Sequence, residues 1–242
     1  MLNCVKRLIC AAAACALLAI GCNDTPVAPT NSITTGTISK SPNIVGVVYA
    51  TTFTFQASGF RSDEGTPLIY DWDFGDETPF FDPTRASGPA ATVTQSYLRT
   101  GVFVVKLTAK SGKGDSASAT LRGVEVVSLT GIWGVRDAAG TFVVRNTYLE
   151  HNKEGITGND TSLNCRFVVV GSVQPPRSVT LTWTRPERDP QRDCQGRGLP
   201  VSALPVSFSF SGSINDAADA LVGTLNDGRP VTIGRCARLS CF

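Results

Sequence analysis

Three carboxylates lie close together in the sequence, because Asp71 and Asp73 flank Trp72 and Asp76 follows three residues later. Closely spaced acidic residues supply the oxygen ligands that calcium binds, so a cation site is the first chemistry to consider. A calcium loop needs a curved backbone, however, whereas Asp71 and Asp73 alternate with aromatic residues at the period of an extended strand. The pattern therefore favours turn and strand-edge roles, and no metal site is predicted.

Catalytic residues are sparse. The only histidine, His151, precedes Asn152, Lys153 and Glu154 in a polar stretch that is expected to be an exposed loop. A nucleophile–histidine site would have to be built around it, and nothing nearby resembles a nucleophile elbow. Paired carboxylates can hydrolyse glycosides without histidine, but the acidic residues here fall mostly in predicted turns and loops. We therefore expect no enzyme activity, no catalytic residue and no cofactor.

The aromatic residues around these carboxylates predict where the strand lies and where it ends. Tyr70, Trp72 and Phe74 share one face, so Trp72 is predicted to be a core residue. Gly75 can adopt a backbone conformation closed to other residues and Asp76 can bond its own backbone, so the strand should end there. A second strand is predicted further on, with one face formed by Phe103, Val105, Leu107 and Ala109.

Together, the stretches Tyr70–Asp76 and Ser96–Thr108 resemble the signature of the PKD domain, an immunoglobulin-like β-sandwich found on cell surfaces. The resemblance runs from about Asn43 to Val127, and Glu77 departs from it because the family usually has a second glycine there. It implies a module that contacts protein or carbohydrate, or acts as a spacer. The residues that carry it, with structural roles, are Tyr70, Trp72, Asp73, Phe74, Gly75, Asp76, Tyr97, Gly101 and Phe103.

Two loops are the best candidates for contact surfaces. Thr78–Pro89 is rich in proline, contains the adjacent Phe80 and Phe81, and is longer than the PKD pattern leads us to expect. Arg185–Arg197 contains four arginines, which could bind a carboxylate or phosphate in bidentate fashion. Acidic residues alternate with these arginines, so local ion pairing explains the second loop without a ligand.

The N-terminus reads as an export signal. Lys6 and Arg7 precede an apolar run that is too short to span a membrane and ends at Gly21 and Cys22. Residues 1–21 resemble a bacterial lipoprotein signal peptide, which implies palmitate-type acyl chains on Cys22 and anchoring to the outer membrane or cell surface. An ordinary cleaved signal with a free Cys22 is the alternative. Residues 22–42 are rich in Thr, Ser and Pro and predict a solvated tether.

Four cysteines follow outside the signal and Cys22, namely Cys165, Cys194, Cys236 and Cys241. An even number in an oxidising compartment predicts two disulfides, with three possible connectivities. The paired close spacings of zinc sites are absent, so metal binding is not favoured. Removing Lys6 and Arg7 from the 22 basic residues leaves 20 against 20 acidic residues, and no basic stripe supports nucleic-acid binding.

Residues 129–242 predict a second all-β domain, after the PKD domain at 43–127. Short alternating segments separated by turns indicate an antiparallel barrel or sandwich, here stabilised by the disulfides. The expected strands are Gly131–Arg136, Thr141–Leu149, Cys165–Val173, Ser178–Arg185, Val206–Ile214, Ala220–Leu225 and Pro230–Cys236. Gly131 and Trp133 resemble the Gly-x-Trp opening of lipocalin-type barrels, and Leu221–Leu225 is similar to repeated strands of small lipocalin-like domains, although Trp133 could equally be the first core residue after a linker.

The combined hypothesis is a noncatalytic, membrane-anchored surface lipoprotein in which both β-domains mediate protein or carbohydrate contact. The first alternative is a carrier of a small apolar ligand in the second domain, since a small barrel can enclose a ligand or be filled by side chains. We expect a filled interior. The second alternative is a structural spacer.

Overall fold

The computed structural model describes residues 32–77, 84–160, 167–185 and 207–236. The chain divides into two compact units, Met1–Thr30 and Asn31–Phe242, and every described residue belongs to the second. Regular structure in the described ranges consists of β-strands, which confirms the all-β prediction. None of these residues forms a helix long and apolar enough to cross a membrane.

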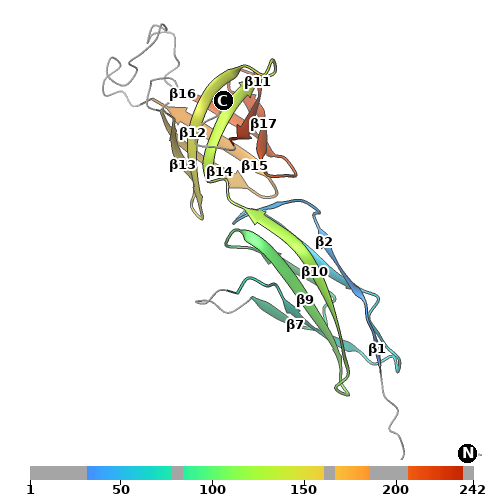
Figure 1. The fold of residues 1–242 in the computed structure, drawn as a ribbon. Helices are drawn as coiled ribbons and strands as arrows, with labels where there is room; N and C mark the ends of the chain where they lie inside the picture. Colours follow the sequence, from blue (N-terminus) through green and yellow to red (C-terminus); the bar gives the residue numbers. More distant parts are fainter. Residues whose placement is uncertain (1–31, 78–83, 161–166, 186–206, 237–242) are drawn as a thin grey trace, which may run out of the picture. The chain divides into compact units, whose positions relative to one another are not determined.

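The first half of the unit is a β-sandwich (Figure 1). One sheet has three strands in the order β2-β4-β8, the other has five in the order β3-β10-β9-β6-β7, and β1 pairs with β5. The strands are β1 Ile33–Thr34, β2 Thr37–Ser41, β3 Gly46–Val47, β4 Thr52–Ser58, β5 Arg61–Ser62, β6 Leu68–Asp73, β7 Arg85–Gly88, β8 Thr92–Ser96, β9 Gly101–Ser111 and β10 Ser116–Val127.

The sandwich core forms where the sequence alternates. In β4, Phe53 and Phe55 are fully buried while Thr54 between them is more exposed, and β9 buries Phe103, Val105, Leu107 and Ala109 as predicted. Trp72 of β6 and Phe74 stack nearly parallel inside the core, with an interplanar angle of 5°. Burying side chains of this size contributes about 1.5–3 kcal/mol each, so these residues hold the two sheets together.

Two predicted irregular segments contain strands. The tether prediction for residues 22–42 is wrong at 33–41, where β1 pairs with β5 and β2 pairs with β4. Within β2, Ile38 and Lys40 are half-buried while their neighbours are exposed, a short alternation that the many Thr and Ser residues obscure in the sequence. The loop prediction for Thr78–Pro89 is wrong at Arg85–Gly88, because these residues form β7 against β6.

The second half is a closed antiparallel barrel of eight strands, in which each strand pairs with the next and the last pairs with the first. This settles the choice between barrel and sandwich. The strands are β11 Gly131–Asp137, β12 Phe142–Asn152, β13 Gly155–Asp160, β14 Phe167–Gln174, β15 Ser178–Thr184, β16 Ser207–Ile214, β17 Ala220–Leu225 and β18 Pro230–Arg235. Seven of them match predicted strands approximately, whereas β13 was not predicted.

Four inward positions of the barrel are glycines that allow neighbouring strands to approach closely. A Cβ at Gly158, Gly171, Gly212 or Gly223 would lie 2.0–2.3 Å from a backbone oxygen of the adjacent strand. Such a distance is inside van der Waals contact, so only glycine permits this approach. Glycines at corners are one way in which a sheet bends enough to close. The Leu221–Leu225 motif is therefore explained by Gly223 between two buried leucines.

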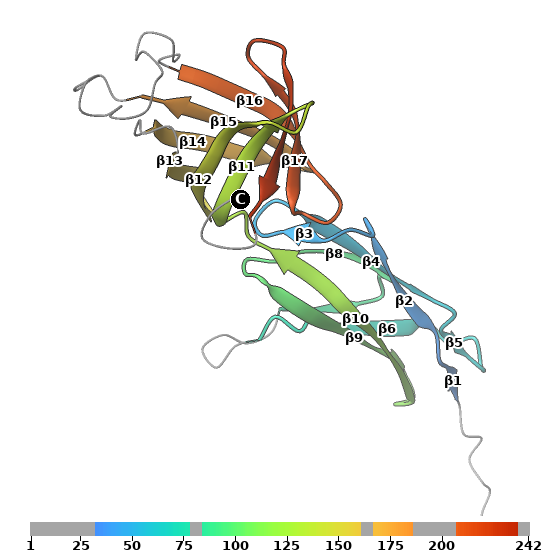
Figure 2. The same ribbon diagram turned by 45° about the horizontal axis from the view of Figure 1, so that its top comes forward.

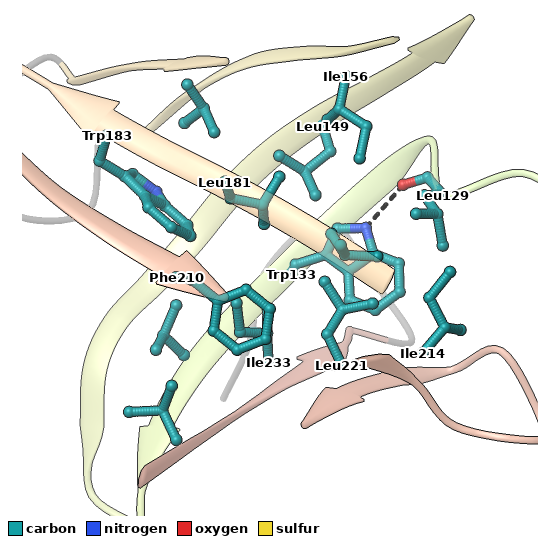
Figure 3. Close-up of a cluster of buried hydrophobic side chains, with 14 of the residues drawn as sticks. Leu129, Trp133, Leu149, Ile156, Leu181, Trp183, Phe210, Ile214, Leu221 and Ile233 are labelled. Carbon is teal, nitrogen blue, oxygen red and sulfur yellow. Dashed lines mark hydrogen bonds between the residues drawn. The ribbon is translucent and has the colours of Figure 1, made fainter. Parts of the chain in front are cut away.

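Large side chains occupy the barrel interior (Figure 3). Trp133 of β11 and Trp183 of β15 are fully buried, and Phe210 of β16 and Ile233 of β18 point toward them, as does Leu181 of β15. The Trp133 indole Nε1–H donates a hydrogen bond to the Leu129 carbonyl oxygen at 2.8 Å, which satisfies the polar edge of the ring. The filled interior that we predicted is present along the described strands.

A turn of the sandwich contributes to the barrel core. Val47 and Ala50 belong to the same buried cluster as Trp133, and the backbone N–H of Val45 donates to the Asp216 carbonyl oxygen at 3.0 Å. Between Val47 and Ala50, Tyr49 has a φ of 65°, a left-handed conformation that is unusual for a bulky residue. The two β-domains therefore share apolar packing within one compact unit.

Candidate functional site

A groove of about 330 Å³ with several charged side chains lies on the outer face of the five-stranded sheet. Its side chains alternate with the core residues of β6, β7 and β9, so the strand periodicity that buries Trp72 also presents them to solvent. Cross-strand pairing places Asp73 between Arg85 and Lys106, and Asp71 between Ser87 and Thr108. The lining residues are Asp71, Trp72, Asp73, Arg85, Ala86, Ser87, Lys106, Thr108 and Lys110.

Asp71 is held by its neighbours on both adjacent strands. The Lys110 ammonium lies 2.6 Å from its carboxylate, and the Ser87 hydroxyl donates to the other oxygen. The Lys110 hydrogen bond, followed by the Ser87 hydrogen bond, lowers the pKa of Asp71 below its ordinary value. Asp71 therefore stays ionised in the groove, and Lys110 is neutralised by it.

Asp73 and Asp76 organise the turn that ends β6. Asp73 accepts a hydrogen bond from the Gly75 backbone N–H at 2.9 Å, while Asp76 accepts from the backbone and hydroxyl of Thr84, both at 2.6 Å. Gly75 has a φ of 68° and lies against the Val104 backbone, where a side chain would clash. No group of metal-binding side chains occurs in the described ranges. These carboxylates stabilise a turn.

Arg85 and Lys106 are the two groove residues whose charged groups are available to a ligand. Both are exposed, and neither forms an ion pair in the part of the chain that the structure describes. The carboxylate between them, Asp73, already accepts the Gly75 N–H. One end of the groove therefore presents two cations around one carboxylate, and it can bind an anionic group through charge-assisted hydrogen bonds.

A second, wider hollow of about 620 Å³ lies near β5 and the start of β6. Phe60 and Tyr70 meet edge to face there, with ring centroids 6.2 Å apart. Arg61, Ser62 and Thr66 add polar groups to its rim. Tyr70 was predicted from the PKD signature as a structural residue, and it packs against the core with one side while lining this hollow with another.

Among the remaining signature residues, Tyr97 and Phe103 lie in the sandwich core, whereas Gly101 is exposed. The Tyr97 hydroxyl donates to the Phe74 carbonyl oxygen at 3.1 Å, its ring stacks on Phe103 at 4.2 Å, and burial raises the pKa of Tyr97 above its ordinary value. Gly101 begins β9 beside the Phe103 ring. These contacts show that the aromatic members of the motif pack on one another.

His151 does not lie in an exposed loop, so that prediction is wrong. It belongs to β12, is only 9% exposed, and packs edge to face against Tyr49 with ring centroids 5.9 Å apart. β12 ends three residues beyond the predicted end at Leu149, and its continued alternation turns the His151 ring inward. Its Nδ1 is buried without a hydrogen-bond partner among the described residues. The ring therefore serves packing between the sandwich turn and the barrel.

We expect acid to destabilise the fold through His151. Burial lowers the pKa of His151 below the ordinary value of 6.5, so the unfolded chain binds a proton more readily than the folded protein. The free energy of unfolding should therefore decrease as the pH falls from 6.5 toward the lowered folded pKa. Urea unfolding of wild type and His151→Phe across this window tests it, because His151 is the only histidine. An equally steep loss in the variant would contradict the assignment.

Several predicted sites lie outside the described residues. They are Cys22, Cys165, Cys194, Cys241, residues 78–83 of the first loop and residues 186–197 of the second. Cys236 follows β18, and its backbone N–H donates to the Ile132 carbonyl oxygen at 2.8 Å. The disulfides and the lipid anchor stay predictions.

Sequence reasoning missed the cationic end of the groove. Lys106 was not singled out, although it alternates with the predicted core residues Val105 and Leu107, and Arg85 was included in a loop. The available signal was the short alternation of Arg85 and Ser87 with Ala86, but a four-residue strand is too brief for periodicity to identify. Only the pairing of β7 with β6 brings Arg85 beside Asp73.

Comparisons with known proteins identify the sandwich. Residues 37–124 match the family model of the PKD domain, which confirms the resemblance found in the sequence. No curated protein matches the chain. A solved structure from a study of carbohydrate-binding modules of the β-sandwich superfamily aligns at 18% identity, covers 83% of this chain and 89% of its own, and has a TM-score of 0.34. A likeness this distant does not identify a ligand.

Proposed function

We propose that the protein is a noncatalytic surface lipoprotein whose PKD domain contacts protein or carbohydrate partners through acidic groups on them. The observation that carries this proposal is the pair Arg85 and Lys106, which are exposed, lie on either side of Asp73, and have no ion-pair partner in the described ranges. The two cations are held on β7 and β9, the strands that flank β6 in a packed sheet, so their separation is kept and a partner anion meets a preorganised site.

The chemistry of the groove supports binding. Asp71 is committed to Lys110 and Ser87, and Asp73 to the turn at Gly75. These carboxylates already have protein partners, so the groups that the groove presents to a ligand are its fixed, positively charged side chains. The Ser87 hydroxyl, which donates to Asp71, and the Thr108 hydroxyl, which is 3.1 Å from the Ser118 hydroxyl, can each still accept a hydrogen bond beside the cations.

The filled barrel disfavours the carrier alternative. Trp133, Trp183 and Phe210 come from different strands and are each at most 1% exposed, so their rings occupy the interior that an apolar ligand would need. No observation on the described residues supports a carrier function in the way that Arg85 and Lys106 support anion binding.

The surface location rests on the export signal and on Cys22. Acyl chains on that residue would hold the PKD domain at a membrane, where it can meet partners outside the cell. Mass spectrometry of the protein extracted from its own membrane tests this. A mature N-terminus at Cys22 carrying acyl chains supports the proposal, and an unmodified Cys22 contradicts the anchor while leaving the groove to be judged separately.

The double variant Arg85→Ser/Lys106→Ser should bind acidic ligands more weakly than the wild-type protein. Charge-assisted hydrogen bonds contribute about 1.5–3 kcal/mol each, so we expect affinity for an acidic polysaccharide such as alginate, or for polyglutamate, to fall about tenfold or more. The two probes distinguish carbohydrate from peptide as the source of the carboxylate. Binding should also weaken as salt is raised, because the contacts are ionic.

A matched control removes two positive charges elsewhere. Arg61→Ser/Lys153→Ser changes the net charge equally but leaves the groove intact, since neither residue lines it. Equal losses in both double variants would mean that binding follows net charge, and the groove would not be the site. Calorimetry or biolayer interferometry with the purified protein gives the comparison.

A further inference from the structure

The outer surface of the barrel differs sharply between its two sides. The outward positions of β14, β15, β16 and β17 carry no charged residue, and most carry a hydroxyl group. We call this surface the hydroxyl face. Its residues are Val168, Val170, Ser172, Gln174, Ser178, Thr180, Thr182, Thr184, Ser207, Ser209, Ser211, Ser213, Ala220, Val222 and Thr224. About a quarter of the residues of a typical soluble domain are charged, so fifteen outward positions without a charge are unusual.

Strand register arranges the hydroxyl face as rows across the barrel. Val170, Thr182 and Ser209 lie opposite one another on β14, β15 and β16, and Thr180 lies opposite Ser211 in the next row. Figure 2 shows β14, β15 and β16 side by side in the barrel wall. Neighbouring strands are about 4.8 Å apart and alternate residues along a strand about 6.8 Å apart. The result is a regular lattice of short side chains.

Most hydroxyls of this lattice are open to a ligand. Among the described residues, Ser172 and Thr180 share one hydrogen bond at 3.2 Å, while Thr182, Ser209 and Ser211 have no side-chain partner. Each Ser or Thr hydroxyl can donate one hydrogen bond and accept two. The unpaired groups can therefore bond a partner without first breaking a contact inside the protein.

Apolar spots are interspersed with the hydroxyls. Val168, Val170 and Val222 are 43%, 57% and 52% exposed, which is high for β-branched apolar side chains. Exposed valines offer contact to C–H groups. The face thus combines small apolar contacts with donors and acceptors, and it does so without any charge.

The opposite side of the barrel does carry charged residues on its outer surface. On β11 and β12, the outward residues include Arg136 and Glu150, and Arg136 stacks over Phe142 at 3.5 Å. The absence of charge is therefore a property of the β14–β17 side among the described positions.

We infer that the hydroxyl face binds a neutral polysaccharide. Such a polymer presents hydroxyls that donate and accept, together with apolar C–H faces, and it needs no counter-charge. A nucleic acid or an anionic lipid surface would require Lys or Arg, which this face lacks. The inference does not depend on the groove of the PKD domain, because the two surfaces share no residue.

The test is affinity electrophoresis of the full chain through gels containing dextran, laminarin, mannan or xyloglucan. At least one should retard the protein, and raising the salt concentration should leave the retardation unchanged, because no ions are released on binding. Thr182→Arg should weaken binding about tenfold or more by placing a bulky charge at the centre of the face. Thr92→Arg, at an exposed position on β8, and the groove double variant should bind as wild type does.

Failure of all four polysaccharides to retard the protein would overturn the inference. Equal retardation of Thr182→Arg and wild type would also overturn it, as would a dimer in light scattering that Thr182→Arg dissociates, because the face would then join two copies. If Thr182→Arg does not fold, Thr182→Val/Ser209→Ala removes hydroxyls at little change in shape, and retention of full affinity by that pair would count against the inference. Binding that does not depend on salt and is unchanged in the groove double variant would belong to the hydroxyl face. Such a result is therefore distinguishable from success or failure of the proposed function.

Discussion

Gly223→Ala should destabilise the barrel by about 3 kcal/mol, at the upper end of the cost of inserting a methyl group into a packed site. A Cβ at Gly223 would lie 2.2 Å from the Ser211 carbonyl oxygen and 2.6 Å from the Gly212 Cα. Both are backbone atoms, so no side chain can rotate away and β16 must move from β17. That movement weakens the β16–β17 pairing, which is one of the pairings that the closed barrel requires. Urea unfolding followed by circular dichroism should show a lower midpoint.

Gly234→Ala is the matched control for this change. Gly234 lies in β18 of the same barrel, but a Cβ there would meet no atom within 4 Å. Substituting alanine where glycine is not needed restricts the unfolded chain and stabilises by about 0.4–1 kcal/mol. We therefore expect a midpoint equal to or above that of wild type. Similar destabilisation by both variants would show that glycine at β17 serves flexibility and not close approach.

These glycines also explain what the sequence could and could not predict about the barrel. Seven strands were predicted because their apolar residues alternate, as in Ser178–Thr184. β13 was missed because Gly155, Gly158, Asn159 and Asp160 are residue types typical of turns. In the structure Gly158 is inward because the neighbouring strand approaches it, and Asp160 is buried where it accepts a hydrogen bond from Thr147. Tertiary contacts override local propensity there.

Closure itself could not be read from periodicity. Alternation shows that one face of each strand is buried, but it does not show whether that face packs on a second sheet or on its own continuation. The pairing of β18 with β11 decides this, and it joins segments about a hundred residues apart. Such contacts leave no local signal in a single sequence.

The candidate site was predictable in part. The alternation around Trp72 correctly placed Asp71 and Asp73 on the outer face of the sheet, and the turn role of Asp76 follows from its contacts with Thr84. Arg85 could not be foreseen as a neighbour of Asp73, because short edge strands resemble loops. The hydroxyl face was also missed, since it depends on the register of several strands and no single segment looks unusual.

Trp133→Ala should destabilise the protein by about 3–5 kcal/mol, the usual cost of truncating a buried tryptophan. Trp133 is fully buried, and its Nε1–H donates to the Leu129 carbonyl oxygen at 2.8 Å. Alanine would leave a large cavity in the shared apolar cluster and an unpaired carbonyl oxygen. Equilibrium urea unfolding, followed by circular dichroism because the change removes one of three tryptophans, measures the loss.

Trp133→Phe separates the two contributions. Phenylalanine keeps most of the apolar volume but cannot donate to Leu129, so it should lose about 1–3 kcal/mol for the buried carbonyl oxygen that is left unsatisfied, plus a smaller packing term. Val47 lies in the same cluster although it belongs to the sandwich strand β3. Trp133→Ala should therefore destabilise the sandwich together with the barrel, in one transition. Two separate transitions, with the sandwich unaffected, would show that the packing at Val47 does not couple the domains.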